Sequence, residues 1–274
     1  MTLPLPDRDR RRTALITGAS SGIGEAFAEV FAAHGFDLVL TARRHDRLRA
    51  VAEQAHARHG AAVELIGADL SDRGSPASIC DELRARGLSV DALVNNAGYG
   101  VPGKYASVPW RDHEALMQVM VVGLAELTYR LVPGMVERGY GRIINVASLA
   151  GLVPAPGGHT LYAASKAFVI RFSEALSSEV RPAGVHVTAL CPGFTYSEFH
   201  DRTGTRASVS RLPSWMWMDS PTVAAQGYEA VMAGERIYIP GRVNRTIAGF
   251  VKYLPNSVIS GVGRKVARLY RKAD

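Results

Sequence analysis

The stretch that decides the fold is Thr13–Gly24, which reads TALITGASSGIG. Its apolar beginning predicts a buried strand, and the glycines that follow predict a tight turn into a helix. Gly18 permits the turn, Gly22 lets a phosphate approach the backbone without meeting a Cβ atom, and Gly24 lets the helix pack closely on the sheet. The start of a helix offers free N–H groups and partial positive charge to an anion. We therefore predict a phosphate-binding loop formed by Gly18, Ser20, Ser21, Gly22, Ile23 and Gly24.

The remainder of the chain alternates between short apolar runs and helix-length segments. The runs are rich in Val, Ile and Leu, as in strands buried on both faces: Asp37–Thr41, Ala62–Ile66, Asp91–Asn95, Arg142–Val146, Val185–Leu190 and Ile237–Ile239. The helical segments are Ile23–His34, His45–His59, Pro76–Arg86, Pro109–Arg138, Thr160–Arg181 and about 220–234, the last with Ser220 as the capping hydroxyl before Pro221. This alternation predicts an α/β fold, a single Rossmann-like doubly wound parallel sheet with helices on both faces. We expect one domain over residues 1–274, with a C-terminal amphipathic extension from about 241.

Composition excludes several classes of protein. The 274 residues are 47% hydrophobic with a mean hydropathy near zero, as in a globular protein with a full core, and no apolar run approaches the ~20 residues that cross a bilayer. The first twelve residues lack a hydrophobic segment, so no secretory signal is expected there. Cys80 and Cys191 are too few for a disulfide scaffold and are expected to be buried, reduced thiols of a cytoplasmic protein.

The formal net charge is +7, and runs of positive charge stand at the two ends of the chain. Basic residues open the chain at positions 8–12 and close it at positions 264–272. Such charge can meet nucleic acid, an acidic lipid surface or a phosphorylated substrate. Neither zinc-finger spacing nor an aromatic RNA-binding motif accompanies it, so we expect no nucleic acid partner and no metal site. A solvated tail is the simpler interpretation of the N-terminal run.

The spacing TGxxxGxG resembles that of the short-chain dehydrogenase/reductase family, and the resemblance extends from residue 13 to about 200. Asn95-Asn96-Ala97-Gly98 is similar to the NNAG motif that shapes the cofactor cleft of that family. Asp69-Leu70 is similar to its adenine-contacting position, and Pro192-Gly193 to the segment that holds the nicotinamide end. The resemblance implies a nicotinamide-dependent oxidoreductase. The cofactor contacts that it implies outside the glycine loop are Asp69, Leu70, Asn96, Ala97, Gly98, Pro192, Gly193 and Thr195.

The choice between NAD and NADP is expected at the end of the second predicted strand. A carboxylate there favours NAD, whereas an arginine accommodates the 2′-phosphate of NADP. The sequence reads Leu40-Thr41-Ala42-Arg43-Arg44 and has no acid before Asp46. Two exposed arginines at a helix start are the alternative, but helix starts favour acids. Charge-assisted contacts from Arg43, with help from Arg44, therefore predict NADP(H) as the cofactor.

Tyr162 and Lys166 are four residues apart in a predicted helix, so their side chains share one face. A neighbouring ammonium would lower the pKa of the tyrosine from about 10 toward the working range. The resemblance implies that Tyr162 donates a proton to a carbonyl oxygen and that Lys166 contacts the nicotinamide ribose. It also implies a hydrogen bond from Ser148, just past the fifth predicted strand, to the same oxygen. Ser148, Tyr162 and Lys166 are the candidate catalytic residues, and the last two are also candidate cofactor contacts.

The sequence departs from the family pattern at two places. The fourth helix of the family usually carries an asparagine that anchors a water in the proton relay to the lysine, and Met120 stands at that position. Because a thioether is at best a weak acceptor, three alternatives stay open: a relay through backbone and water, impaired catalysis, or replacement by Gln118 from a shifted helix. Tyr162 also lies one residue further from Ser148 than is usual, which Gly157-Gly158 could absorb.

Residues 194–221 match the variable region that covers the substrate in this family. Ser197 falls where the family has a hydroxyl near the pyrophosphate. Aromatic and methionine side chains suit an apolar, adaptable pocket, and the apolar residues here are Phe194, Tyr196, Phe199, Leu212, Trp215, Met216, Trp217 and Met218. Simple packing of Trp215 and Trp217 on the core is equally open. Residues 124–200 resemble the branch that includes bacterial short-chain reductases and very-long-chain 3-oxoacyl and steroid reductases, which favours a small lipophilic ketone.

Beyond Gly241 the apolar residues are spaced for two short amphipathic helices. Packing on the protein itself or on a sister subunit, in a homodimer or homotetramer, is the preferred interpretation. Peripheral contact with an anionic membrane is the alternative. The leading function is NADPH-dependent reduction of an apolar ketone, reversible as an alcohol dehydrogenase. The rivals are a weak or inactive nucleotide-binding sensor or scaffold, and a protein that acts at a lipid surface through its basic tail.

Overall fold

The computed structural model describes residues 11–154, 158, 160–199 and 212–253. Its main strands are β1 Thr13–Thr17, β2 Asp37–Ala42, β3 Val63–Gly67, β4 Ala92–Asn95, β5 Gly141–Val146, β6 Val185–Leu190 and β9 Ile237–Tyr238. They form one sheet in the order β3-β2-β1-β4-β5-β6-β9, and every neighbouring pair is parallel. The strand order reverses between β1 and β4, which is where such folds bind dinucleotides. The predicted doubly wound α/β sheet is confirmed.

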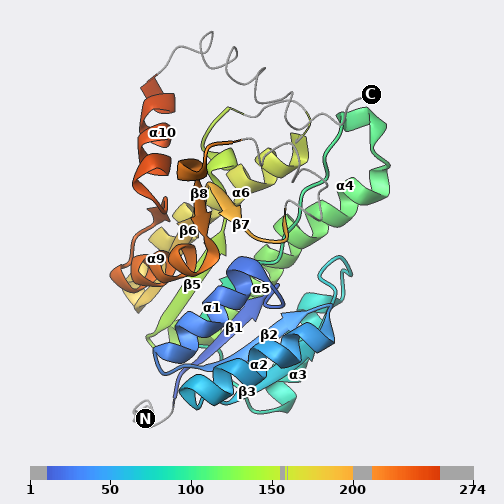
Figure 1. Cartoon of the computed structure of the whole chain (residues 1–274). Coiled ribbons are helices and arrows are strands. Elements are labelled where there is room, and N and C mark those ends of the chain that lie inside the picture. The colour runs from blue at the N-terminus through green and yellow to red at the C-terminus, as the bar shows by residue number, and fades with distance from the viewer. Residues whose placement is uncertain (1–10, 155–157, 159, 200–211, 254–274) are drawn as a thin grey trace.

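Helices cover both faces of this sheet (Figure 1). One face carries α1 Gly22–Ala33, α2 His45–His59 and α9 Ser220–Ala233, and the other carries α3 Ser75–Ala85, α4 Trp110–Met117, α5 Gly123–Glu137 and α6 Thr160–Val180. A buried cluster around Phe27 and Phe31 fills the first layer, and a cluster around Leu93 and Leu127 fills the second. Because both faces are covered, the central strands are buried along nearly their whole length rather than at alternate residues.

The long helix predicted from Pro109 to Arg138 is interrupted. A π-helical turn, Gln118–Val122, separates α4 from α5, and such turns are rare and recur at functional sites. Within the described part of the chain, Trp110–Glu137 is the helix long and apolar enough to cross a membrane, contrary to the expectation of no such run. Leu116, Met120 and Leu127 of this helix are fully buried, so it is a core helix of the α/β fold.

Helix α9 is capped differently from the prediction. Its N-cap is Asp219, whose Oδ1 accepts a hydrogen bond from the backbone N–H of Thr222 at 2.6 Å. The hydroxyl of Ser220 donates instead to the carbonyl oxygen of Tyr196 at 2.9 Å. Tyr196 ends β7 Phe194–Tyr196, which pairs in parallel with β8 Trp217–Asp219. The hydroxyl is therefore used to tie this small sheet to α9, and the preceding carboxylate takes the role of cap.

After β9 the chain continues into α10 Arg242–Tyr253, which stands at the end of the molecule beside β8 (Figure 1). It is the first of the two amphipathic helices predicted beyond Gly241. The second predicted helix, most of the N-terminal basic run, the C-terminal basic residues and Gly157 lie outside the described residues. Cys80 and Cys191 are free, buried thiols, as predicted.

Candidate active site

The glycine loop between β1 and α1 is compact. Gly18 and Gly22 have φ values of +66° and +60°, a left-handed conformation that glycine adopts without strain. A Cβ atom at Gly18 would lie 2.9 Å from Nδ2 of Asn96, and one at Gly24 would lie 2.5 Å from the same nitrogen and collide with the carbonyl of Gly18. Gly24 therefore makes room for the loop and for Asn96, not for the sheet as predicted. Ser21, the N-cap of α1, makes no side-chain capping bond in the described structure, which leaves the helix start open to an anion.

Asn96 and Ala97 join the end of β4 to the end of β1. The backbone N–H groups of Asn96 and Ala97 both donate to Oγ1 of Thr17 at 3.0 Å. The side-chain amide of Asn96 donates to the carbonyl oxygens of Thr17 at 3.0 Å and Gly18 at 3.3 Å. These bonds fix the NNAG segment beside the glycine loop at the point where the strand order reverses.

The two arginines after β2 lie in different surroundings. Arg44 is the N-cap of α2, and its Nη2 donates to Oγ of Ser20 at 3.1 Å and Oγ of Ser21 at 2.9 Å. Arg43 is more than half exposed, and its Nη1 lies 3.6 Å from Oδ2 of Asp69. Arg44, for which we expected the lesser role, is thus the arginine that contacts the glycine loop.

Asp69 and Leu70 follow β3, so they lie at the same carboxyl edge of the parallel sheet as the glycine loop. Leu70 is buried, whereas Asp69 accepts hydrogen bonds from the backbone N–H and the hydroxyl of Ser71 at 3.0 and 2.8 Å. Partial burial opposes the charged form of Asp69, but the bonds from Ser71 and the charge of Arg43 outweigh it and hold the pKa below its usual value. Asp69 is therefore an ionised, ordered acceptor at the adenine end of the predicted cleft.

Ser148, Tyr162 and Lys166 lie together, as predicted, at the carboxyl end of β5. The backbone N–H of Leu149 donates to the carbonyl oxygen of Pro192 at 2.8 Å, so Ser148 lies against the segment after β6. The side chains of Ser148 and Tyr162 are hydrogen-bonded to each other. Nζ of Lys166 donates to the carbonyl oxygen of Val146 at 2.7 Å and lies 5.8 Å from the centroid of the Tyr162 ring.

Burial controls the pKa values of this group. It raises the pKa of Tyr162 above 10, and the hydrogen bond with Ser148 opposes that shift only in part. Burial lowers the pKa of Lys166 to about 8, opposed by the nearby Cys191. The predicted lowering of the Tyr162 pKa by Lys166 is therefore wrong for the protein by itself, because burial disfavours the phenolate and raises the pKa. Tyr162 is protonated at neutral pH, the form that donates a proton.

Met120 lies in the π turn and faces the same group. A Cβ atom at Gly98 would lie 3.6 Å from both Cγ and Sδ of Met120 and 3.7 Å from Nζ of Lys166. Gln118 is buried in the same turn, and its amide nitrogen has no hydrogen-bond partner among the described residues. Met120, the residue that departs from the family pattern, therefore lies close to Lys166, the candidate catalytic lysine.

The variable region contributes aromatic residues near the candidate acid, of which Phe199 contacts Tyr162. The rings of Phe199 and Tyr162 lie 5.5 Å apart between centroids. Trp217 contacts Phe194 and stacks on Tyr196, with centroids 5.4 and 4.7 Å apart. Thr195, between them, is buried and donates to the carbonyl oxygen of Gly193 at 3.2 Å. Phe199 therefore places an apolar ring against Tyr162, and Phe194, Tyr196 and Trp217 form a separate aromatic cluster in the same region.

Several residues that shape the site were missed by sequence reasoning. Beneath the ends of β4 and β5, the amide of Asn95 donates to Oδ1 of Asn145 at 2.9 Å, and the amide of Asn145 donates to Oγ of Ser173 at 2.9 Å. The available signal was an asparagine inside an otherwise apolar strand. Asn244 of α10 is buried against Gly193, where a Cβ atom would lie 2.8 Å from its Cγ. No local signal connects these two distant positions.

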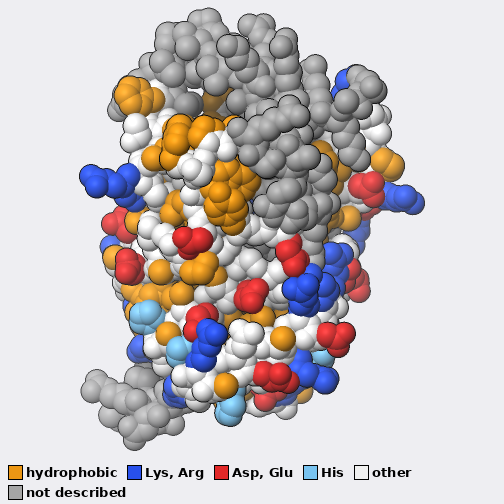
Figure 2. All heavy atoms as spheres, in the orientation of Figure 1, with side chains coloured by type: hydrophobic (Ala, Val, Ile, Leu, Met, Phe, Trp, Pro, Cys, Tyr) orange, Lys and Arg blue, Asp and Glu red, His pale blue; other side chains and the backbone are white. Residues whose placement is uncertain are grey.

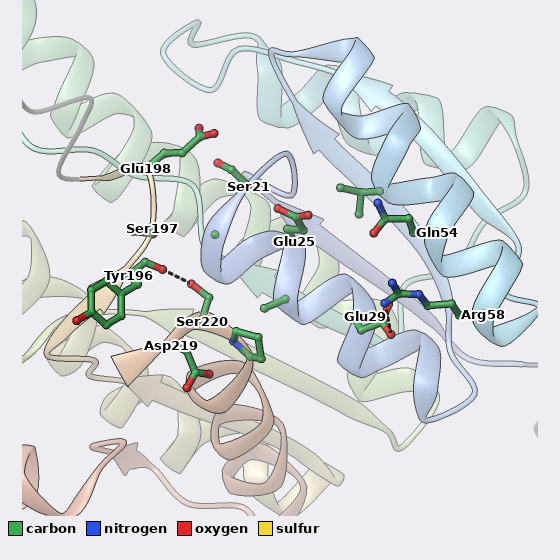
Figure 3. Close-up of a pocket in the computed structure, with 14 residues that line it drawn as sticks. Ser21, Glu25, Glu29, Gln54, Arg58, Tyr196, Ser197, Glu198, Asp219 and Ser220 are labelled. Atoms are coloured by element: carbon green, nitrogen blue, oxygen red, sulfur yellow. Dashed lines mark hydrogen bonds and ion pairs between the residues drawn. The ribbon is translucent and has the colours of Figure 1, made fainter. Parts of the chain in front are cut away.

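A cavity of about 600 Å³ opens next to the site, between α1, α2 and the start of α9 (Figure 3). Ser21, Gly22 and Glu198 contribute to its lining, but Tyr162 and Lys166 do not. It therefore borders the glycine loop from the outer side of α1, away from Tyr162.

A parallel sheet whose order reverses beside a glycine loop and a helix start defines a dinucleotide-binding α/β protein. The sequence model of the short chain dehydrogenase family matches residues 12–207, and the chain belongs to that family of oxidoreductases. The predicted resemblance is confirmed.

Known relatives cover most of the chain. Sulfoacetaldehyde reductase 2 of Chromohalobacter salexigens is 39% identical over 187 residues, which are 68% of this chain and 73% of the relative. The very-long-chain 3-oxoacyl-CoA reductase of Anas platyrhynchos is 32% identical over 266 residues, which are 94% of this chain and 80% of the relative. A short-chain dehydrogenase from Sphingobium yanoikuyae, solved in complex with NADPH, superimposes with a TM-score of 0.77 at 32% identity, covering 90% of this chain and 97% of the other.

Proposed function

We propose that the chain is an NADPH-dependent carbonyl reductase of an apolar ketone, reversible as an alcohol dehydrogenase. The observation that carries the proposal is the hydrogen-bonded pair of Ser148 and Tyr162 beside the buried Lys166, at the same edge of the sheet as the glycine loop. Residues of these types in contact can position a carbonyl oxygen and deliver one proton to it.

The residues present fit a nicotinamide dinucleotide phosphate. The positive-φ glycines form the tight turn that a backbone needs to approach a phosphate, and the start of α1 offers N–H groups to the pyrophosphate. Arg44 with Ser20 and Ser21 forms a cationic, hydroxyl-lined site suited to the 2′-phosphate. Around the rest of the cofactor we place Ile23, Arg43, Asp69, Leu70, Asn96, Ala97, Gly98, Tyr162, Lys166, Pro192, Gly193 and Thr195. NADPH when bound would supply the hydride.

Tyr162 would act as the general acid in reduction. Its raised pKa keeps the hydroxyl protonated at neutral pH, and Ser148 would donate to the same substrate oxygen and orient it. Lys166, with a pKa of about 8, is close to the range in which it can both hold the ribose and pass a proton onward. In the reverse direction the same tyrosine would accept the proton from an alcohol.

The proposed substrate is an apolar ketone of the 3-oxoacyl or hydroxysteroid type. The names of the two relatives, a sulfoacetaldehyde reductase and a very-long-chain 3-oxoacyl-CoA reductase, describe carbonyl compounds of opposite polarity, so membership of the family does not settle the choice. The ring of Phe199 against Tyr162, together with the paired rings of Phe194 and Trp217 in the same variable region, favours the apolar class.

A panel of substrates tests this proposal. Apolar ketones, steroid ketones, 3-oxoacyl thioesters and a sulfonated aldehyde are offered to the full chain, and oxidation of NADPH is followed. We expect the largest kcat/KM for the apolar ketones. Preference for the sulfonated aldehyde would contradict the substrate class. Tight NADPH binding without turnover of any compound would instead support a nucleotide-binding sensor or scaffold.

We propose a second property, peripheral binding to an anionic membrane through the C-terminal segment. Residues 241–274 hold eight of the 32 Lys and Arg residues and one of the 25 Asp and Glu residues, so the whole net charge of +7 lies there and the first 240 residues are neutral. Within α10, Val243 and Phe250 are exposed, as is Trp215 next to this helix. Figure 2 shows hydrophobic side chains gathered over this end of the molecule. Apolar residues beside dense positive charge are typical of helices that lie on anionic lipid.

Vesicles test this second proposal directly. We expect cosedimentation with vesicles that contain phosphatidylglycerol, loss of binding at high salt, and weaker binding of Phe250→Ser. Equal binding to neutral phosphatidylcholine vesicles, or none to either kind, would contradict it. Self-association that Phe250→Ser abolishes, without lipid binding, would assign α10 to a subunit contact.

We propose that the chain forms a homodimer or a homotetramer and that it acts in the cytoplasm. Exposed Tyr129 of α5 and Phe168 of α6 leave apolar surface on two helices that cover the same face of the sheet, and such surface marks protein contacts. Light scattering of the full chain measures the assembly, and a monomer at micromolar concentration would contradict it.

A further inference from the structure

Glu198 forms an ion pair with Arg44, the arginine that we assign to the 2′-phosphate, and a second one with Arg47. Its Oε2 lies 2.9 Å from Nη1 of Arg44, and its Oε1 lies 3.4 Å from Nη1 of Arg47. Arg44 uses its other terminal nitrogen for Ser20 and Ser21. Both terminal nitrogens of Arg44 are therefore engaged, one by the glycine loop and one by a carboxylate from the substrate side of the molecule.

The chain on either side of Glu198 touches both parts of the site. Ser197 packs on the glycine loop, where a Cβ atom at Gly22 would lie 2.9 Å from the Cβ of Ser197. Phe199, the next residue along, lies against the ring of Tyr162. Figure 3 shows Glu198 beside Ser21, at the rim of the cavity and next to the start of α1. A movement of the backbone at Glu198 would also move Phe199, because the two residues are adjacent in the chain and Phe199 packs on Tyr162.

A carboxylate and a phosphate compete for one guanidinium. The phosphate carries the larger charge and three acceptor oxygens, so it forms the stronger bidentate contact with an arginine. The pair between Glu198 and Arg44 is about one third exposed on each side, and pairs so exposed contribute little to stability. The carboxylate is therefore weakly held, and a second anion beside it is repelled.

We propose that Glu198 is the residue that couples recognition of the 2′-phosphate to access of the ketone. It neutralises Arg44 and Arg47 until the phosphate displaces it, and its displacement moves Phe199 relative to Tyr162. NADH, which lacks this phosphate, leaves Glu198 on the arginines and Phe199 on the tyrosine. The inference rests on the proposed assignment of Arg44 to the 2′-phosphate.

Binding of two adenosine nucleotides isolates the competition. Calorimetry compares 2′,5′-ADP, which carries the 2′-phosphate, with 5′-AMP, which does not, on the natural chain, Glu198→Gln and the matched control Glu29→Gln. Glu29 borders the same cavity but pairs with Arg58 and His59. We expect Glu198→Gln to bind 2′,5′-ADP about three- to tenfold more tightly, with 5′-AMP binding unchanged and the control like the natural chain.

The kinetics of the ketone test the coupling. In the natural chain the KM of the ketone should be higher with NADH than with NADPH, and in Glu198→Gln the two KM values should converge. Unchanged or weaker binding of 2′,5′-ADP to Glu198→Gln, or a difference in KM that persists, overturns the inference. If the natural chain itself does not prefer 2′,5′-ADP to 5′-AMP, the assignment of Arg44 fails, which is a failure of the proposed function.

Discussion

Met120 and Lys166 lie on the same side of Gly98. The thioether of Met120 lies 3.6 Å, and the ammonium of Lys166 3.7 Å, from the point that a Cβ atom of Gly98 would occupy. Met120 is fully buried in the π turn between α4 and α5. A weak acceptor thus stands where the family pattern has an amide, within reach of the lysine that would resupply the proton of Tyr162.

Replacing Met120 by asparagine should raise turnover. An amide beside Lys166 can hold a relay water, so resupply of the proton should become faster and the pH dependence should change, with little effect on NADPH affinity. If the buried amide finds no partner, the free energy of unfolding should fall by about 1–3 kcal/mol. Turnover and melting temperature are measured together, with Met120→Leu as the control of similar volume. Unchanged turnover at unchanged stability would show that position 120 has no part in the relay.

Removing the guanidinium of Arg44 should weaken the binding of NADPH more than the binding of NADH. Because Arg44 contacts both serines of the glycine loop, Arg44→Ala should weaken NADPH binding by about 1.5–3 kcal/mol and NADH binding much less. Arg43→Ala should have the smaller effect, since Arg43 is more exposed. Dissociation constants of both cofactors check this prediction. Equal losses for NADPH and NADH in Arg44→Ala would contradict the assignment.

Lys166 should make stability depend on pH in a predictable direction. Burial lowers its pKa from 10.5 to about 8, so between these pH values the unfolded chain binds the proton more tightly and the free energy of unfolding rises with pH. Below about pH 8 the buried ammonium reduces stability. Lys166→Met should therefore raise the free energy of unfolding at pH 7 by about 1–3 kcal/mol, and the difference should shrink toward pH 10.

Urea unfolding of the natural chain and Lys166→Met at several pH values checks this prediction. The variant should also lose activity, because the same lysine is a candidate catalytic residue. A variant that is less stable at pH 7, with a difference that does not change with pH, would contradict the depressed pKa.

The sheet and its helices could be predicted because their signals are local. Runs such as Arg142–Val146 are short and rich in Ile and Val, and Gly18 and Gly22 stand where the backbone must turn. Ser148, Tyr162 and Lys166 could be placed together because strand ends and one helix face fix their positions. The assignment of their roles stays a prediction.

The features that could not be predicted depend on contacts between residues that are far apart in the sequence. The pKa of Tyr162 is set by its burial in the folded chain, which the four-residue spacing to Lys166 does not reveal. Asp219 displaced Ser220 as the cap because Tyr196, 24 residues earlier, accepts from that hydroxyl. The ion pair of Glu198 with Arg44 joins the segment after β7 to the start of α2, and no pattern along the chain connects them.

The most direct test of the account is the Tyr162→Phe variant. Turnover at saturating ketone and NADPH is measured beside the dissociation constant of NADPH. Because only the hydroxyl that donates the proton is removed, turnover should fall about 10²- to 10⁴-fold while NADPH affinity stays nearly intact. Near-normal turnover of Tyr162→Phe at saturating substrate would contradict the assignment of Tyr162 as the general acid.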